Sequence, residues 1–308
     1  MRLAGFACLL TAALAVAGCG GSEASGPGTK TSRGTIAELL KRPGVDVALV
    51  PGTSEYSPGT VRVSFLVVRH DGSTVDRPRA HVWIARGLHQ VPYRQATATL
   101  EPIGVPGRSE LALGGAGSTF VVHLEAPKPG RYWVLAEPVG ARPPIQALGN
   151  LVVEATSSEP AVGAKAIPSR TPTIASTNGD LRELTTQSPP DRDLLRYSVA
   201  DSLAAHKPFL LAFATPKFCT SRTCGPVVDV VQAVRNRFAG SDVRFIHVEI
   251  FRDNDPAKCY NRWVKQWRLP TEPWIFLVGA DGRIKAKFEG PVSVAELAAG
   301  VRKHLLRR

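Results

Sequence analysis

The sequence predicts a two-domain protein, with an antiparallel β-sandwich first and an α/β domain second. The chain has 308 residues, which is long enough for two ordinary domains with a core in each. Apolar and polar residues alternate through residues 45–155, whereas residues 192–308 combine helical periodicity with continuous apolar runs. With 44% hydrophobic and 21% charged residues, the composition is that of a globular protein.

The first 18 residues have the layout of a secretory signal peptide. Arg2 precedes an apolar run, Leu3 to Val16, that is too short to span a bilayer. The run ends in "VAGC", which resembles the bacterial lipobox; the resemblance implies that Cys19 carries the lipid (a palmitate-type chain) and begins the mature protein. Residues 19–44, rich in Gly and Ser at their start, are expected to form a tether. We therefore expect a lipid-anchored, extracytoplasmic protein on the outer face of the bacterial cell membrane.

Residues 45–155 are predicted to form the β-sandwich. Val61, Val63, Phe65 and Val67 alternate with polar residues, so they should share one buried face. Further short apolar runs follow, separated by turns rich in Gly, Pro, Asn and Asp, a pattern typical of an immunoglobulin-like fold. Its histidines are scattered over different strands and loops, so we expect no metal site there, and the sequence does not indicate what this domain binds.

Residues 156–191 lack periodicity and are rich in Pro, Ser and Thr, so they are expected to form a linker. The α/β domain should follow at 192–308. A helix capped by Asp191 or Asp193 is expected first, then buried strands at 207–215 and 243–251. A second helix is expected after the cysteines, with Val227, Val231, Val234 and Phe238 on one apolar stripe. A third helix is expected from Asp255, and after it a hairpin. The closing helix should turn four residues inward: Val294, Leu297, Val301 and Leu305.

The formal net charge of +12 is high, but it does not indicate nucleic-acid binding. The sequence has no basic run interleaved with aromatic residues and no nucleic-acid motif. A basic surface would also suit anionic lipids. Nothing in the sequence indicates a bound cofactor or metal.

Three cysteines remain in the expected mature domain after Cys8 leaves with the signal peptide and Cys19 is lipidated: Cys219, Cys224 and Cys259. Outside the reducing cytosol a disulfide can persist, so one pair and one lone thiol are expected. Cys259 falls at helical spacing from Trp263 and Trp267, which predicts a buried, inert thiol on a helix.

The order of elements in residues 190–308 resembles the thioredoxin-like superfamily, and in particular the extracytoplasmic TlpA/ResA-like lipoproteins. The motifs behind the resemblance are "FATPKFC", the proline in "GPVVDVV", Pro273 in "TEPWIFLV" and the turn "GADGRI". The resemblance implies a thioredoxin fold and thiol–disulfide oxidoreductase activity on protein thiols or disulfides of exported clients. It also implies that Pro273 follows a cis peptide bond and lies beside the dithiol, where it binds the substrate backbone.

The cysteine pair departs from the family, because its spacing is C-x4-C rather than C-x-x-C. Aligning "CGPV" with the family motif would make Cys224 the nucleophile, but it would lengthen the preceding loop by several residues. Aligning the helix instead places Cys219 at the nucleophile position, with Cys224 as the resolving thiol, and we favour this register. A second departure is Ala212, which stands where many members have a buried Asp. Glu249 is the candidate that could replace this acid as a proton carrier.

Three alternatives stay open at this point. Some peroxiredoxins also use a C-x4-C pair, but they need a threonine three residues before the attacking thiol, where this chain has Pro216. A Sco-like copper chaperone would add a histidine to the two thiols, with His247 or His304 as candidates. The third alternative is a non-catalytic docking module with a structural disulfide.

Overall fold

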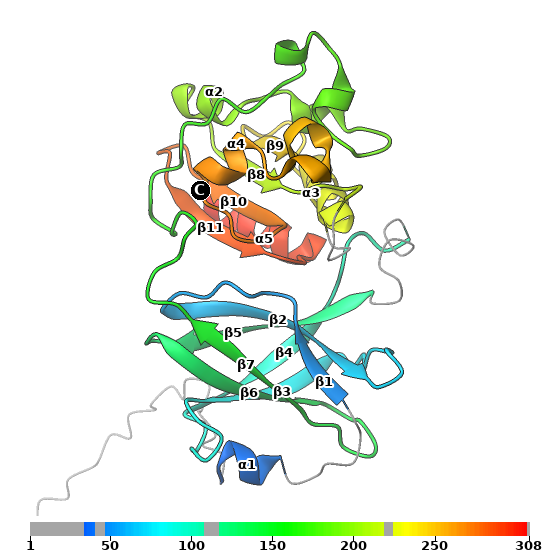
Figure 1. Ribbon diagram of the computed structural model, residues 1–308, viewed down its shortest axis with the longest axis vertical. Helices are drawn as coiled ribbons and strands as arrows, with labels where there is room; N and C mark the ends of the chain where they lie inside the picture. Colours follow the sequence, from blue (N-terminus) through cyan, green and yellow to red (C-terminus); the bar gives the residue numbers. More distant parts are fainter. Residues whose placement is uncertain (1–33, 41–46, 108–116, 219–223, 307–308) are drawn as a thin grey trace, which may run out of the picture.

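A computed structural model describes residues 34–40, 47–107, 117–218 and 224–306. These residues form two units stacked along the long axis of the molecule (Figure 1). The expected signal peptide, Cys19 and Cys219 lie outside the described residues. Within the described residues, no helix is long and apolar enough to cross a membrane.

The N-terminal unit is one seven-stranded antiparallel sheet. Its strands are β1 (Val47–Pro51), β2 (Gly59–Arg69), β3 (Arg79–Ala85), β4 (Arg94–Pro102), β5 (Ser118–Ala126), β6 (Gly130–Pro138) and β7 (Ala147–Val153). They pair in the order β1-β2-β5-β4-β3-β6-β7. The two edge strands approach each other, because a Cβ on Gly149 of β7 would lie 2.8 Å from the Leu49 side chain of β1. The sheet is therefore a nearly closed barrel and not the expected two-sheet sandwich.

The core of this β-domain matches the alternation in the sequence. Val61, Val63, Phe65 and Val67 are all buried, which confirms the predicted inward face of β2. Phe65 stacks on Phe120 of the neighbouring strand β5, with ring centroids 5.4 Å apart. Helix α1 (Ile36–Leu39) covers the end of the barrel far from the C-terminal unit (Figure 1) and buries Ile36 there.

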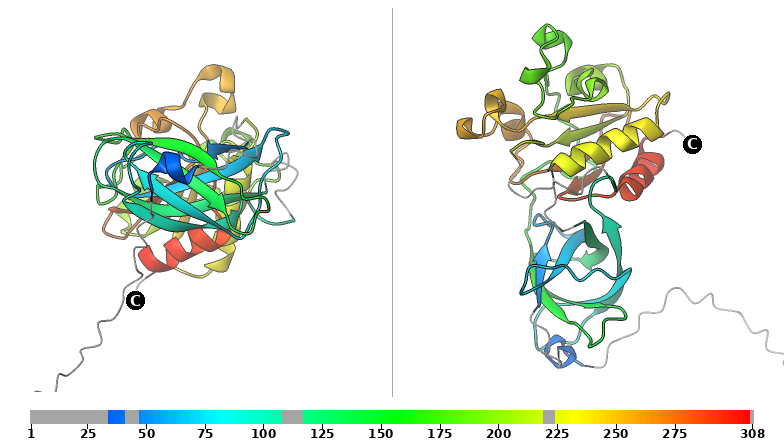
Figure 2. Two further views of the ribbon diagram at one scale, coloured as in Figure 1. Left: turned by 90° about the horizontal axis from the view of Figure 1, so that it is seen from below. Right: turned by 90° about the vertical axis from the view of Figure 1, so that its right-hand side faces the viewer.

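The C-terminal unit contains a four-stranded sheet in the order β11-β10-β8-β9. Its strands are β8 (Phe209–Phe213), β9 (Arg244–Val248), β10 (Trp274–Val278) and β11 (Ile284–Glu289); β8 and β9 are parallel and the other pairs antiparallel. Helices α3 (Cys224–Arg237) and α5 (Val294–His304) lie side by side along one face (Figure 2). A second apolar cluster covers the other face.

The two helices predicted for residues 191–203 and 255–267 are wrong as continuous helices. The first is a 3-10 turn, Arg192–Leu195, followed by α2 (Val199–Ala204). The second is a 3-10 turn, Pro256–Lys258, followed by α4 (Arg262–Gln266). Each helix starts late because a side-chain cap fixes its first residue: Ser198 accepts the amide of Asp201, and Asn261 accepts two amides.

These differences correct the expected fold class. The protein is predominantly β, its largest element is the seven-stranded sheet, and helices α2 and α4 of the C-terminal unit are shorter than the expected fold implies. Most local predictions in this unit nevertheless agree with the structure. Both buried strands, the hairpin and the closing helix are present, and Val294, Leu297, Val301 and Leu305 are buried as predicted.

Residues 156–191, expected as a linker, run along the C-terminal unit and contribute to its core. The amide of Gly163 donates to Ile284 O (2.8 Å), and the amide of Ile284 donates to Ala164 O (2.9 Å), which adds a short paired segment beside β11. Ala166 is buried in the apolar cluster on the face of the sheet opposite α3 and α5. The segment is thus fixed to the unit that follows it.

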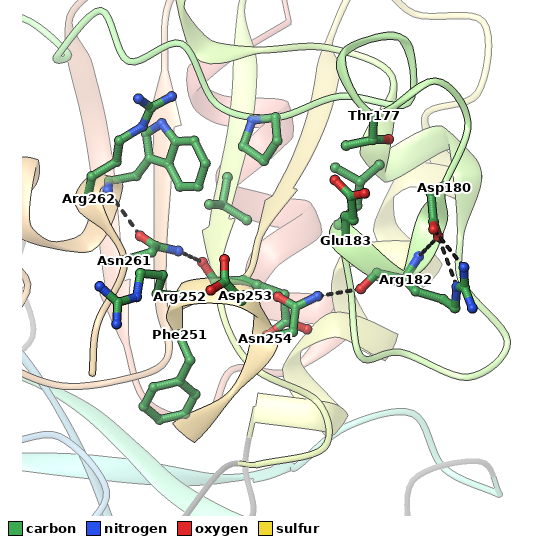
Figure 3. Close-up of a pocket in the computed structure, with 15 residues that line it drawn as sticks. Thr177, Asp180, Arg182, Glu183, Phe251, Arg252, Asp253, Asn254, Asn261 and Arg262 are labelled. Atoms are coloured by element: carbon green, nitrogen blue, oxygen red, sulfur yellow. Dashed lines mark hydrogen bonds and ion pairs between the residues drawn. The ribbon is translucent and has the colours of Figure 1, made fainter. Parts of the chain in front are cut away.

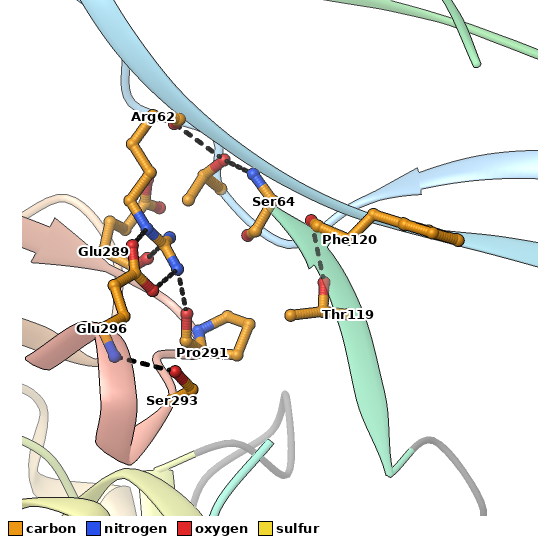
Figure 4. A network of polar contacts seen from close by, with 9 residues as sticks. Arg62, Ser64, Thr119, Phe120, Glu289, Pro291, Ser293 and Glu296 are labelled. Atoms are coloured by element: carbon orange, nitrogen blue, oxygen red, sulfur yellow. Dashed lines mark hydrogen bonds and ion pairs between the residues drawn. The ribbon is translucent and has the colours of Figure 1, made fainter. Parts of the chain in front are cut away.

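Polar contacts join the two units (Figure 4). Arg62 on β2 donates to both carboxylate oxygens of Glu296 on α5 (2.6 and 2.8 Å) and to Pro291 O (2.8 Å). The buried carboxylate of Glu289 on β11 accepts the amide of Ser54 (2.9 Å), its hydroxyl (2.7 Å) and the amide of Glu55 (2.8 Å). Charge-assisted hydrogen bonds therefore hold the β-domain against the hairpin and the last helix.

Candidate functional site

The cysteine-bearing segment lies at the carboxyl end of β8. Cys219 is outside the described residues. Cys224 is the first residue of α3, and only its backbone is described. The described ends of the segment meet, since a Cβ on Gly225 would lie 3.4 Å from Pro216 O. Pro216, which follows β8, and Gly225, the second residue of α3, therefore lie close together on either side of the two cysteines.

Helix α3 is anchored firmly behind this segment. Val227, Val231 and Val234 are fully buried against the sheet, as the apolar stripe in the sequence predicts. At its other end, Arg235 donates to the carboxylates of Asp191 (2.6 Å) and Asp193 (2.9 Å). A rigid helix thus presents its N-terminal amides at the cysteine segment.

A buried carboxylate lies behind the segment. Glu249, which follows β9, is 4% exposed, and its Oε1 accepts the amide (2.5 Å) and the hydroxyl (2.7 Å) of Thr186. The same Thr186 hydroxyl accepts the amide of Lys217 (3.1 Å), two residues before Cys219. Glu249 Oε2 and the buried hydroxyl of Thr215 have no hydrogen-bond partner among the described residues. One hydroxyl therefore links the buried acid to the start of the cysteine segment.

His247, one of the two histidines considered as copper ligands, is buried on β9 with both ring nitrogens engaged. Its Nε2 pairs with Ala214 O (3.0 Å), and its Nδ1 lies 3.5 Å from the Thr185 hydroxyl. His304 is on α5 and lines a pocket at the junction of the two units instead. Within the described part of the chain, no three histidine, cysteine or acidic residues form a group able to hold a metal.

Pro273 directly precedes β10 at the same end of the sheet as the cysteine segment. Trp274 pairs with Phe213, the last residue of β8, so Pro273 lies beside the exit of that strand. The Glu272–Pro273 peptide bond is cis, which confirms that expectation. Whether Pro273 binds a substrate backbone stays a prediction.

An open pocket of about 670 Å³ adjoins this end of the sheet (Figure 3). One wall comes from the segment before α2 and carries Glu183, and the other comes from the residues after β9 and carries Asn261 and Arg262. Asn261 Nδ2 donates to Glu249 O (2.5 Å), so the cap of α4 also holds the chain that bears the buried acid. Sequence reasoning missed this pocket, because its walls lie far apart in the chain.

The prediction for Cys259 is wrong. The residue is an exposed free thiol outside α4, and it does not share a helix with Trp263 and Trp267. Its backbone has a φ of 59° and a ψ of 178°, which no helix accommodates. The Asn261 cap, which starts the helix two residues later, was the signal in the sequence that could have shown this.

No family model and no curated protein matches the chain. Among solved structures, it is similar to the solution structure of the PKD domain from the human VPS10 domain-containing receptor SorCS2. The two are 18% identical, the match covers 46% of this chain and 98% of that chain, and the TM-score is 0.18. At this TM-score the likeness carries no argument about fold or function.

The family assignment expected from the sequence is corrected by these findings. The chain is predominantly β, and its largest element is a nearly closed seven-stranded antiparallel sheet, so membership of the thioredoxin-like superfamily is contradicted.

Proposed function

We propose that the protein is a membrane-anchored, extracytoplasmic thiol–disulfide oxidoreductase whose C-x4-C pair is Cys219 and Cys224. The observation that supports this most is the proximity of Pro216 and Gly225, the described residues on either side of the two cysteines. When the ends of a short stretch of chain are held together, two thiols within it have a reduced entropic cost of reaching each other. The proximity of these flanking residues therefore favours a reversible disulfide within the pair.

The N-terminus of α3 supplies the electrostatics for thiol chemistry. The first amides of a helix lack partners within the helix and carry its positive dipole end, which stabilises a thiolate nearby. Cys224 opens α3, and Cys219 precedes it by five residues. Lys217 is exposed beside the segment and adds positive charge. We assign the nucleophile to Cys219 and the resolving role to Cys224.

The reaction conserves electrons between the pair and a client. The Cys219 thiolate attacks one sulfur of a client disulfide, which forms a mixed disulfide and releases the other client sulfur as a thiolate. The Cys224 thiolate then attacks Cys219, which leaves the client as a dithiol and the pair as a disulfide. The reverse sequence oxidises the client. Protein thiols or disulfides of exported clients are the substrates, and no cofactor takes part in either direction.

Glu249 is the described group best suited to exchange a proton with this pair. Its carboxylate is buried and reaches the cysteine segment through the Thr186 hydroxyl (2.7 and 3.1 Å). Resolution of the mixed disulfide requires Cys224 to lose a proton, and a carboxylate behind the segment can accept it. We assign Glu249 a positioning and proton-carrying role rather than contact with the client.

The β-domain serves as a spacer between the membrane and the dithiol. The described chain begins at Gly34, just before α1, at the end of the β-domain that lies far from the C-terminal unit (Figure 1). A lipid on Cys19 and the tether that follows would attach there, so the C-terminal unit would face away from the bilayer. The copper alternative is weakened by His247, whose ring nitrogens are both engaged within the domain.

Trapping the mixed disulfide tests the proposal. A full chain with Cys224→Ser lacks the resolving thiol, so it should accumulate a disulfide between Cys219 and a thiol client or glutathione, seen as a mass shift that dithiothreitol reverses. Cys219→Ser should accumulate none at that position. If Cys224→Ser forms no adduct and labelling shows Cys219 unreactive, the proposed activity is wrong.

Cys259→Ser provides the matched control, because this thiol is exposed but lies outside the pair. It should leave the trapping by Cys224→Ser unchanged when the two substitutions are combined. Glu249→Gln in the wild-type pair should slow resolution of the mixed disulfide and change the pH dependence of that step. Its rate of initial attack should stay near that of the wild type.

A further inference from the structure

A second pocket of about 670 Å³ lies at the junction of the two units. The β-domain contributes β2 and β5 to its wall, and the C-terminal unit contributes β11 and the end of α5. Trp274 and Phe288 supply apolar surface, while several basic side chains reach it from both units. The proposed thiol chemistry makes no use of this pocket.

Three of the basic side chains lack a partner within the described residues. Arg62 is paired with Glu296, Lys285 with Asp281 and Lys287 with Glu159. In contrast, the side chains of His123 on β5 and of Lys303 and His304 on α5 form no hydrogen bond or ion pair in the described structure. These three bases therefore remain available to a ligand.

Two acidic side chains line the same pocket, and one of them, Glu289, is satisfied internally. Glu289 accepts hydrogen bonds from Ser54, Glu55 and the Thr271 hydroxyl (2.9 Å). Glu55 is the exception, since its carboxylate has no partner among the described residues. Burial, together with the charges of Glu289 and Glu159, raises its pKa. The pocket thus has an unmatched basic end and a single unmatched acid.

Electrostatics at the basic end agree with the geometry. Desolvation, with Lys303 and Lys285 nearby, lowers the pKa of His304. Desolvation also lowers the pKa of His123, where Arg62 and Lys303 act in the same direction and Glu296 opposes them. Cations that disfavour a further positive charge create a potential that attracts an anion.

We propose that this junction pocket binds a small anion carrying a phosphate group, held by Lys303, His304 and His123. A phosphate oxygen suits an ammonium and imidazole donors, because charge-assisted hydrogen bonds are the strongest that such groups make. The ligand would contact both units, since His123 belongs to the β-domain and the other two bases belong to α5. The phosphate could come from a free metabolite or from a lipid headgroup.

Calorimetric titration of the full chain with inorganic phosphate tests the site. Wild type should bind with saturation near one equivalent, and the double variant Lys303→Gln/His304→Asn should bind about tenfold more weakly or worse, because two charge-assisted contacts are lost. Lys265→Gln is the matched control, since Lys265 is an exposed lysine outside the pocket. It should bind as the wild type does. Absence of saturable binding, or equal affinity in the double variant, would overturn the proposal.

Two further binding measurements distinguish the source of the phosphate and test the role of the histidines. Soluble dihexanoyl phosphatidylglycerol should compete with phosphate if a headgroup is the ligand, and should fail to compete if the site takes free anions only. Sulfate keeps its charge between pH 8 and 6, so its binding reports on the histidines. Its affinity should rise as the pH falls, and this rise should shrink in His304→Asn. A sulfate affinity independent of pH would exclude the histidines from the site.

Discussion

The two units differ in the kind of polar side chain that they bury. The buried carboxylates and the buried histidine among the described residues all belong to the C-terminal part: Glu159, Asp191, His247, Glu249 and Glu289. The buried polar residues of the β-domain, Thr53, Ser64 and Thr119, are small hydroxyls. Burial of charge is costly unless it is paired, so a protein concentrates it where it has a use.

This contrast separates a scaffold from a chemical site. The β-domain closes one sheet around its main apolar cluster and gains its stability from packing. The C-terminal unit places buried acids where they meet other parts of the chain: Glu249 behind the cysteine segment and Glu289 at the junction. Substitutions should therefore act on stability in the first unit and on chemistry or coupling in the second.

The largest effect is expected from Phe65→Ala in the β-domain. Phe65 is fully buried and stacks on Phe120, so truncation should leave a cavity and lower the free energy of unfolding by about 3–5 kcal/mol. Urea denaturation measures this value. Val152→Ala, at a side chain 42% exposed in the same domain, should change it by less than about 0.5 kcal/mol. A loss below about 1 kcal/mol for Phe65→Ala would mean that the core is not packed as described.

An intermediate effect is expected from Arg62→Met at the junction. The substitution leaves Glu296 without its ion pair in a poorly exposed site, which should cost about 1–3 kcal/mol, less than for a fully buried pair. Hydrogen exchange should rise on both sides of the junction, in β2 and in α5. Lys207→Met removes an exposed pair with Asp242 and should cost at most about 1 kcal/mol. Equal costs for the two variants would show that the junction contributes no special stability.

The smallest effect is expected from alkaline pH on the β-domain. Burial raises the pKa of Tyr56 from its usual 10 to about 12. The folded state therefore resists ionisation that the unfolded state undergoes, so this stability is complete below pH 10 and is lost as the pH rises to about 12. Tyr56→Phe loses the hydrogen bond to Thr53 O (2.7 Å), about 1 kcal/mol at pH 7, but should flatten the alkaline decline. Unchanged steepness in this variant would contradict the assignment.

Local patterns in the sequence predicted most of the elements but not how they assemble. Alternation identified β2, and apolar runs identified β8 and β9, because the order of apolar and polar residues within a strand reflects which of its side chains are buried. The pairing of β2 with β5 and the approach of β1 to β7 depend on contacts between distant segments, which no local pattern encodes. The two-sheet sandwich was therefore the wrong arrangement of mostly correct strands.

The candidate site was predictable only in part. The cysteine spacing and Pro273 could be recognised from the sequence, and Glu249 was suspected as a proton carrier. The hydrogen bond between Glu249 and Thr186 joins residues that are 63 positions apart in the chain. Thr186 belongs to the segment that had been expected to be a linker. The junction pocket could not be predicted either, because its basic residues come from β5 and α5, which lie far apart in the chain. The late start of α4 was missed because the Asn261 cap competes with a plausible helix start at Asp255.

Redox titration of the full chain against glutathione tests the central claim most directly. A working Cys219–Cys224 pair should exchange reversibly, with a midpoint potential above roughly −300 mV, because structural disulfides typically lie below that value. Cys259→Ser should leave the midpoint unchanged, and Cys219→Ser should abolish the transition. A pair that stays oxidised below roughly −300 mV, or that does not exchange at all, would contradict the claim and identify the bond as structural.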